Sequence, residues 1–222
     1  MLRAIRFAAK LNFQLEAKTA APILPLSELL NEISNHRLFD ESQKLLNSGH
    51  SARILTLLQE YKLFHRLFPL AKTDQASALT LLQLTAKSTD QRIADGRSVN
   101  PAFFYAALLW PAVKEEQQKL VDRGESLYPA LQQAGQRIIN RQCQRTAITR
   151  FTAQAIREIW EMQPRLTHPR SRQIEALLQQ QRFRAAYDFL VLREEAGEDT
   201  LNMGDWWTHF QEADPGLRAE LA

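Results

Sequence analysis

Apolar residues recur at helical spacing along almost the whole chain. One row runs from Ile54 to Phe68 in steps of three and four residues, and another runs from Ile156 to Gln163. No stretch alternates apolar and polar residues as a half-buried strand would. Glycine and proline are also few, at 7 and 9 residues. The pattern predicts an all-α protein of about nine to eleven helices.

Capping residues mark the expected starts of two of these helices. Asn100 followed by Pro101 is a typical helix start, because Asn accepts hydrogen bonds from free backbone N–H groups and Pro suits the first helical position. The segment from Ala102 to Trp110 is apolar on every face, so we expect it to be central and buried. Thr149 is expected to cap a helix that runs to Gln163. Helix breaks are expected at Pro22 to Pro25, Ser48-Gly49, Pro69, Asp95-Gly96, Pro111, Gly124, Pro164, His168-Pro169, Gly197, Gly204 and Pro215-Gly216.

The first predicted helix, residues 2–13, carries a single cationic stripe. At about 100° per residue, Arg3, Arg6 and Lys10 fall within an arc of about 60°. The residues on both sides of that arc are apolar. Unpaired cations on a mostly buried helix are costly, so something anionic should face them. A carboxylate of a neighbouring helix or the phosphate of a ligand would both serve.

A second stripe consists of Arg37, Glu41 and Lys44, spaced i, i+4, i+7. Glu41 could pair with Arg37 on its own helix, which would stabilise an exposed helix by only a few tenths of a kcal/mol. It could instead reach across to Arg3 or Arg6 and fix the orientation of a phosphate-binding guanidinium. We favour the second interpretation, because binding groups need support from their neighbours.

The overall charge is small, but its distribution is uneven. The 222 residues have a formal net charge of +3. Residues 137–184 hold ten arginines and no lysine against three glutamates, whereas residues 185–222 hold two arginines and nine acidic side chains. Guanidinium groups match phosphate oxygens in a two-pronged geometry, so the basic block suits a nucleic acid. A solvated basic face covered by the acidic tail is the competing interpretation.

Several classes of site are excluded or disfavoured by the residues present. Cys143 is the only cysteine, so neither an internal disulfide nor a cysteine-based zinc cage can form. The five histidines show no metal-ligand spacing and no His-Asp pair occurs, which argues against a metal centre. No run of eighteen apolar residues predicts a membrane span, and the first residues do not read as a signal peptide. We therefore expect a soluble cytoplasmic protein.

Five blocks of sequence resemble a known family. LRAIRFAAKL (Leu2 to Leu11) and RLFDESQKLL (Arg37 to Leu46) look like the neck region of class II nucleotidyltransferases, which include bacterial poly(A) polymerases and CCA-adding enzymes. VNPAFFYAALLWP (Val99 to Pro111), FRAAYDFLVLR (Phe183 to Arg193) and WWTHFQ (Trp206 to Gln211) narrow the resemblance to the bacterial poly(A) polymerases. An arginine-rich stretch, LTHPRSR, is also similar. The resemblance covers nearly the whole chain.

The resemblance implies an all-α neck and body and a family reaction that transfers AMP from ATP to RNA 3′ ends. In that family a small α/β head holds two Mg²⁺ ions with a D-x-D pair that follows a Gly-Ser turn. This chain has neither a D-x-D sequence nor a Gly-Ser dipeptide. We therefore expect no catalytic residue here, no tight binding of ATP or Mg²⁺ by the chain alone, and no polymerisation without a head. The sequence leaves open whether a separate head domain is a partner.

The resemblance also assigns roles to the stripes and to the basic block. It implies a neck domain over residues 1–50, in which Arg3 and Arg6 line the nucleotide pocket, and an RNA-binding body domain over residues 51–222. The neck residues expected to support the pocket are Lys10, Arg37, Glu41 and Lys44. The side chains expected to contact the RNA 3′ end are Arg141, Arg145, Arg150, Arg157, Arg165, Arg170 and Arg172.

Two alternative functions stay open. A fragment of a CCA-adding enzyme is one, although such a body should lack the FRAAYDFL and WWTHFQ blocks. A stand-alone helical RNA-binding protein is the other. Exposed aromatic residues could stack bases in either case, but aromatic pairs at helical spacing usually pack in the core. We expect core packing for Phe103, Phe104, Tyr105, Phe183, Tyr187, Trp206 and Trp207.

Overall fold

The computed structural model describes residues 1–214, 216 and 218, and these residues form helices without a single strand. The all-α prediction is thus confirmed. The α-helices are α1 (Leu2–Leu11), α2 (Ala17–Ala20), α3 (Asn35–Leu46), α4 (Ser51–Glu60), α5 (Phe64–Leu67), α6 (Ala76–Ala94), α7 (Pro101–Val121), α8 (Leu127–Cys143), α9 (Arg150–Thr167), α10 (Ile174–Leu178), α11 (Phe183–Glu195) and α12 (Met203–Glu212). Two 3₁₀ helices, η1 (Pro25–Glu32) and η2 (Ser171–Gln173), join them.

The described residues contain one α-helix more than the range of nine to eleven, because the apolar rows are cut into shorter pieces than expected. The row from Ile54 to Phe68 is not continuous. Helix α4 ends at Glu60, and Lys62 takes a left-handed backbone conformation with φ 55° before α5 begins. That turn points both short helices into the same core.

Two expected breaks do not occur, because helices continue through their prolines. Pro111 lies inside α7 and Pro164 lies inside α9. An interior proline costs a helix about 3 kcal/mol in lost hydrogen bonding and steric conflict. Packing offsets that cost. Trp110 and Gln163, the residues before the two prolines, are both buried in contacts with α11.

The two predicted N-caps are confirmed. The Asn100 side chain accepts a hydrogen bond from the Ala102 N–H at 2.9 Å, and the Thr149 hydroxyl accepts one from the Thr152 N–H at 3.2 Å. The segment from Ala102 to Trp110 is buried except at Phe103, which is half-buried. Helix α7 is therefore central, as its all-round apolar sequence predicts.

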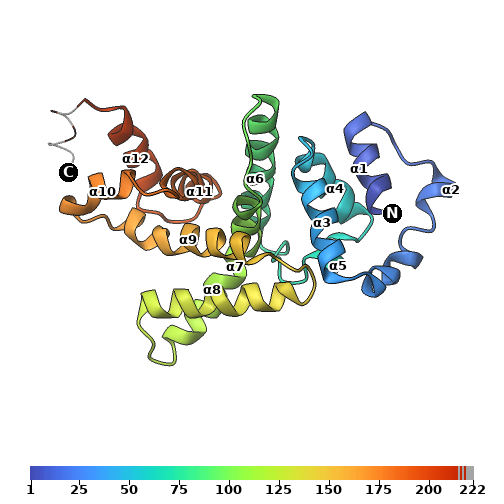
Figure 1. Ribbon diagram of the computed structural model, residues 1–222, viewed down its shortest axis with the longest axis horizontal. Coiled ribbons are helices and arrows are strands. Elements are labelled where there is room, and N and C mark those ends of the chain that lie inside the picture. Colours follow the sequence, from blue (N-terminus) through green and yellow to red (C-terminus); the bar gives the residue numbers. More distant parts are fainter. Residues whose placement is uncertain (215, 217, 219–222) are drawn as a thin grey trace.

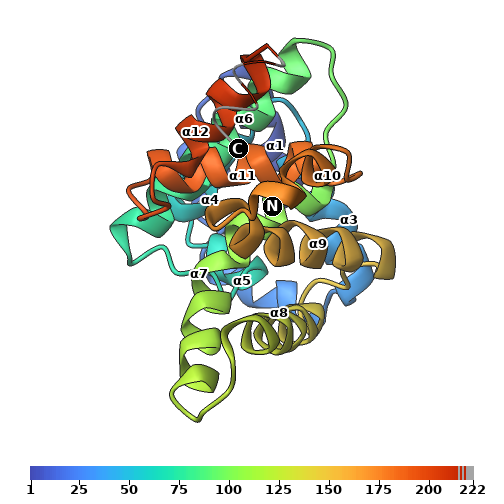
Figure 2. The same cartoon turned by 90° about the vertical axis from the view of Figure 1, so that its left-hand side faces the viewer.

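The helices spread along an elongated molecule with α6 near its middle (Figure 1). Helices α1 to α5 lie on one side of α6, α9 to α12 lie on the other, and α7 and α8 extend away below them. Figure 2, turned by a quarter, places α11 and α12 toward the viewer and the α7–α8 turn at the far lower end. The buried apolar side chains form two clusters. The larger extends from Leu2 to Leu192, and the smaller joins the end of α9 to α10, α11 and α12.

Asp90 of α6 ties the start of α4 to the centre of the fold. Its carboxylate accepts hydrogen bonds from the Ser51 N–H at 2.7 Å, the Ser51 hydroxyl at 2.6 Å and the Ala52 N–H at 2.9 Å. The two backbone N–H groups are donors that the first turn of a helix cannot satisfy internally. The larger core also continues across residue 50. The division into domains at that residue stays a prediction.

A buried ion pair closes the junction between α7, α9 and α11. Arg193, only 5% exposed, donates to both carboxylate oxygens of Glu198 at 2.9 and 2.8 Å and to the Gln163 side chain at 2.7 Å. Its guanidinium lies 4.7 Å from the ring centre of Trp110. Burial opposes ionisation of Glu198, but the hydrogen bonds and charges of Arg193 and Lys114 outweigh it and lower the pKa of Glu198 to about 2.

Candidate nucleic-acid interface

The cationic stripe on α1 faces solvent rather than a carboxylate. Arg3 and Lys10 are exposed and Arg6 is half-buried. Within the described part of the chain, none of the three side chains forms an ion pair or a hydrogen bond. The Arg6 guanidinium lies 5.6 Å from the ring centre of Phe7, which is itself 46% exposed. The stripe thus combines unpaired cations with uncovered apolar surface.

Glu41 does not hold Arg3 or Arg6 by an ion pair, so the favoured interpretation of its role is wrong. Its carboxylate instead accepts a hydrogen bond from Lys44 at 2.8 Å on the same helix. That bond is the largest reason why the pKa of Glu41 is lowered, and the charges of Arg6 and Arg3 also contribute. The two arginines are therefore near Glu41 without touching it. The intrahelical pair between Glu41 and Arg37 is also not formed, because the shorter i, i+3 step to Lys44 takes its place.

The seven arginines expected to contact RNA fall into three groups. Four are exposed and form no side-chain hydrogen bond or ion pair with the rest of the described chain: Arg141, Arg150, Arg170 and Arg172. Arg157 and Arg165 are held by glutamines, since Arg157 donates to Gln136 at 3.0 Å and Arg165 donates to Gln180 at 3.3 Å. These six side chains belong to α8, α9 and the segment of η2. We call them the arginine strip.

Arg145 has a different environment from the arginine strip. It donates to the backbone carbonyl oxygens of Arg66 and of Leu30, the latter at 3.2 Å, and so joins the end of α8 to α5 and η1. Burial and the nearby Arg66 charge lower the pKa of its guanidinium. A side chain committed to two carbonyl groups is poorly placed to bind a phosphate. Its position supports a structural role.

The aromatic residues expected in the core are mostly there. Phe104, Tyr105, Phe183, Tyr187 and Trp207 are buried, whereas Phe103 and Trp206 are half-buried. Trp207 donates its indole N–H to the Leu166 carbonyl at 2.9 Å, which fixes α12 against α9. The prediction that these side chains pack in the core is thus confirmed for the five buried residues.

An aromatic side chain that the sequence reasoning overlooked is Phe151, in the first turn of α9. It is 72% exposed and lies at the edge of a cleft of about 680 Å³. The first turns of α7, α9 and α11 and the last turns of α6 line this cleft. The sequence signal that could have found it is an aromatic residue two positions after the Thr149 cap, off the apolar row of α9.

Three arginines also line the cleft, and two carboxylates hold them. Arg182 donates to Glu158 at 2.9 Å, and its guanidinium lies 5.8 Å from the ring centre of Phe151. Asp188 pairs with Arg184 at 2.9 Å and more loosely with Arg92 at 3.9 Å. Burial raises the pKa of Asp188 against the opposing effect of these two arginines. Three guanidinium groups against the two carboxylates leave one net positive charge, which would attract an anion.

The described residues offer no set of ligands for a divalent metal. No group of three or more His, Cys, Asp or Glu side chains comes together in residues 1–214, 216 and 218. Magnesium needs oxygen ligands in near-octahedral order, so the residues described do not fit the ion that the family's head would hold. In the same part of the chain no helix is long and apolar enough to cross a membrane.

Comparisons with known proteins match the arginine-rich part of the chain to a known family. The family model for the arginine-rich C-terminus of polymerase A matches residues 123–222, which include the whole arginine strip. A second model, described as the "probable RNA and SrmB-binding site of polymerase A", matches residues 12–74. Poly(A) polymerase I of Salmonella typhi is 36% identical over 97% of this chain. The chain belongs to the bacterial poly(A) polymerase family.

The match to the poly(A) polymerases extends over the chain but not over the whole of its relatives. Poly(A) polymerase I of Haemophilus influenzae is 34% identical over the full chain and 50% of its own length, and the chain covers 48% of the Salmonella typhi enzyme. The chain therefore spans about half the length of these curated relatives. A CCA-adding enzyme of Bacillus cereus strain Q1 is 38% identical over 43% of the chain and 23% of its own length. The match to the CCA-adding enzyme is shorter than the matches to the poly(A) polymerases, which favours the poly(A) polymerases.

Proposed function

We propose that this chain is the part of a poly(A) polymerase that orients RNA and nucleotide, within an enzyme that transfers AMP from ATP to RNA 3′ ends. The observation that carries this proposal is the set of guanidinium groups without a carboxylate partner on α1 and on the arginine strip. Unpaired arginines attract phosphate, and the family match supplies the class of substrate. The expected location of the enzyme is the cytoplasm.

The two cationic surfaces would have separate tasks. Arg3 and Arg6 would face the triphosphate of ATP, with Lys10, Arg37 and Lys44 contributing positive charge nearby and Glu41 holding Lys44. The arginine strip would contact successive phosphates of the RNA strand. Such contacts carry no sequence information, which suits an enzyme that extends many different RNAs. Residues 1–50 would act as the neck and residues 51–222 as the body.

The chain alone should bind RNA but should not extend it. The described residues hold no carboxylate set for Mg²⁺, and in-line phosphoryl transfer depends on such ions, so a separate head domain would have to supply them. We expect no elongation of a labelled RNA primer with ATP and Mg²⁺. Metal-dependent tailing by the pure chain would contradict the proposed division of labour.

Filter binding across a salt series separates this proposal from a stand-alone RNA-binding protein. Weak binding that falls steeply between 50 and 200 mM salt would fit a body that relies on a partner domain for affinity. Tight binding that persists at 200 mM salt would favour an independent RNA-binding module.

A further inference from the structure

The cleft beside Phe151 is lined by other residues than the two surfaces assigned above. No residue of α1 and no member of the arginine strip lines it. Its volume of about 680 Å³ lies within the range of small-ligand sites, roughly 300–1,000 Å³. Its floor is apolar, with Phe103, Phe104 and Ile159 among the lining residues. A flat organic ligand could therefore enter.

The cleft wall is chemically suited to a nucleotide. Phe151 presents an open aromatic ring, and aromatic rings stack on any base without regard to its identity. Arg92, Arg182 and Arg184 surround the same space, and the carboxylates of Asp188 and Glu158 balance two of these three charges. One aromatic platform next to several guanidinium groups is the combination by which proteins hold single-stranded nucleic acid.

The backbone adds to this attraction. The first turns of α7, α9 and α11 line the cleft, and each helix start carries a partial positive charge. These helices have 21, 18 and 13 residues, so their dipoles are fully developed. The arginines and the aromatic ring remain the features that select a nucleotide over a simple anion.

We propose that this cleft holds one nucleotide of a single-stranded RNA, with its base stacked on Phe151 and its phosphates facing Arg184 and Arg92. The lining of the cleft includes no residue of α1, the helix proposed to face the triphosphate. The occupant is therefore a nucleotide of the RNA strand away from the incoming ATP. The site would anchor the strand while its 3′ end is extended elsewhere. This inference rests on the proposed function, because it assumes that the substrate is RNA.

The test is fluorescence anisotropy of a labelled oligoadenylate of about 15 nucleotides with the full chain at low salt. Phe151→Ala and Phe151→Leu should each weaken binding roughly five- to a hundredfold, the effect of removing one stacked base. Phe151→Trp should keep the wild-type affinity. Leu127→Ala, which truncates another strongly exposed apolar side chain, should have no effect. A purely structural role of Phe151 would be met by Leu, so the Leu and Trp variants separate the two roles.

Two further arms identify the ligand. An abasic oligonucleotide of the same length should bind wild type and Phe151→Ala alike, whereas Arg184→Gln should weaken its binding. Free ATP at millimolar concentration should not displace the oligoadenylate. Displacement from wild type but not from Phe151→Ala would show that the cleft takes the free nucleotide, and would overturn the proposal.

The result also distinguishes this inference from the proposed function. If wild type binds the RNA and Phe151→Ala binds it equally well, the cleft is not an RNA site and the proposed function stands. If wild type shows no binding at low salt, both are overturned.

Discussion

Individual arginines in this protein serve two purposes that their sequence context does not separate. Arg172 is exposed and without a partner in the described chain, whereas Arg145 donates to carbonyl groups of residues 66 and 30. Both belong to the same arginine-rich block. The sequence predicted that both side chains are cations suited to phosphate, but it did not predict which of them faces solvent. The carbonyl groups that hold Arg145 come from distant parts of the chain.

Glu198 gives a prediction at the scale of a single residue. Glu198→Gln should destabilise the fold by about 3–5 kcal/mol at pH 7, because it leaves the buried Arg193 without its counter-charge. The folded-state pKa of about 2 lies below the ordinary 4.5, so the stabilisation is fully present above pH 4.5 and is lost as pH falls toward 2. Urea unfolding at a series of pH values would measure it.

The difference in the free energy of unfolding between wild type and Glu198→Gln should therefore be constant from pH 7 to 5 and should shrink by pH 3. Glu195→Gln is the matched control, since Glu195 is an exposed neighbour that forms neither an ion pair nor a hydrogen bond with Arg193. Its stability should stay within about 0.5 kcal/mol of wild type. A gap for Glu198→Gln that does not change down to pH 3 would contradict the assigned pKa.

At the scale of whole elements, the sequence predicted helix starts better than helix ends. Asn100 and Thr149 cap their helices as expected, because an N-cap acts on donors only two or three residues away. Pro111 and Pro164 do not end theirs, because the deciding contacts come from α11, far along the chain. Short elements such as α2 and α5 escaped prediction since four residues carry too little periodicity.

Removing the Asp90 side chain tests whether its capping of α4 stabilises that helix. Asp90→Ala leaves the backbone N–H groups of Ser51 and Ala52 without their acceptor, whereas the Ser51 hydroxyl keeps the Ala86 carbonyl, so we expect a loss of about 1–2 kcal/mol in the free energy of unfolding. Asp95→Ala, on the exposed end of the same helix, should cost less than 0.5 kcal/mol. Equal effects of the two substitutions in chemical denaturation would show that the cap does not support α4.

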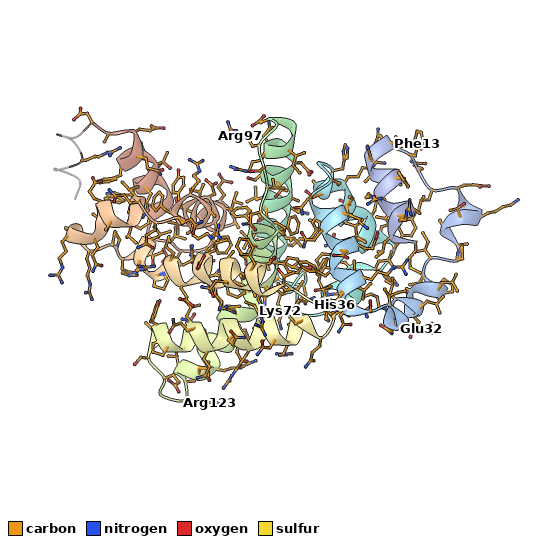
Figure 3. All side chains as sticks on the ribbon, viewed as in Figure 1. Phe13, Glu32, His36, Lys72, Arg97 and Arg123 are labelled. Atoms are coloured by element: carbon orange, nitrogen blue, oxygen red, sulfur yellow. The ribbon has the colours of Figure 1, made fainter. Side chains whose placement is uncertain are left out.

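At the scale of the whole molecule, the candidate interface is a set of surfaces rather than one cavity. The α1 stripe belongs to the first helix, the arginine strip to α8, α9 and η2, and the Phe151 cleft to the junction of α6, α7, α9 and α11. Figure 3 labels two exposed arginines outside these surfaces, Arg97 near the upper end of α6 and Arg123 at the α7–α8 turn. Sequence reasoning found the stripe because it follows one helical period, and it found the strip because ten arginines crowd into residues 137–184. It missed the cleft because four helices that are far apart in sequence build it.

The α1 stripe has its own molecule-scale prediction. If Arg3 and Arg6 face polyphosphate, Arg3→Gln together with Arg6→Gln should weaken binding of ATP to the chain joined with the head domain of a poly(A) polymerase. The double substitution should leave folding stability almost unchanged, because neither side chain forms an ion pair or a hydrogen bond in the described chain. Equilibrium dialysis with labelled ATP and a thermal melt would measure the two quantities. A lower melting temperature with unchanged ATP binding would assign the stripe to packing instead.

The most direct test of the account is the salt dependence of RNA binding after charge reversal on the arginine strip. Arg150→Glu with Arg172→Glu should weaken oligoadenylate binding. The negative slope of log affinity against log salt should become shallower by about 1.4, which is near 0.7 for each lost phosphate contact. The control, Lys119→Glu with Arg123→Glu at the far end of α7, makes the same change in net charge away from the strip. The predicted result is a shallower slope for the strip variant alone, and equal slopes for both variants and wild type would contradict it.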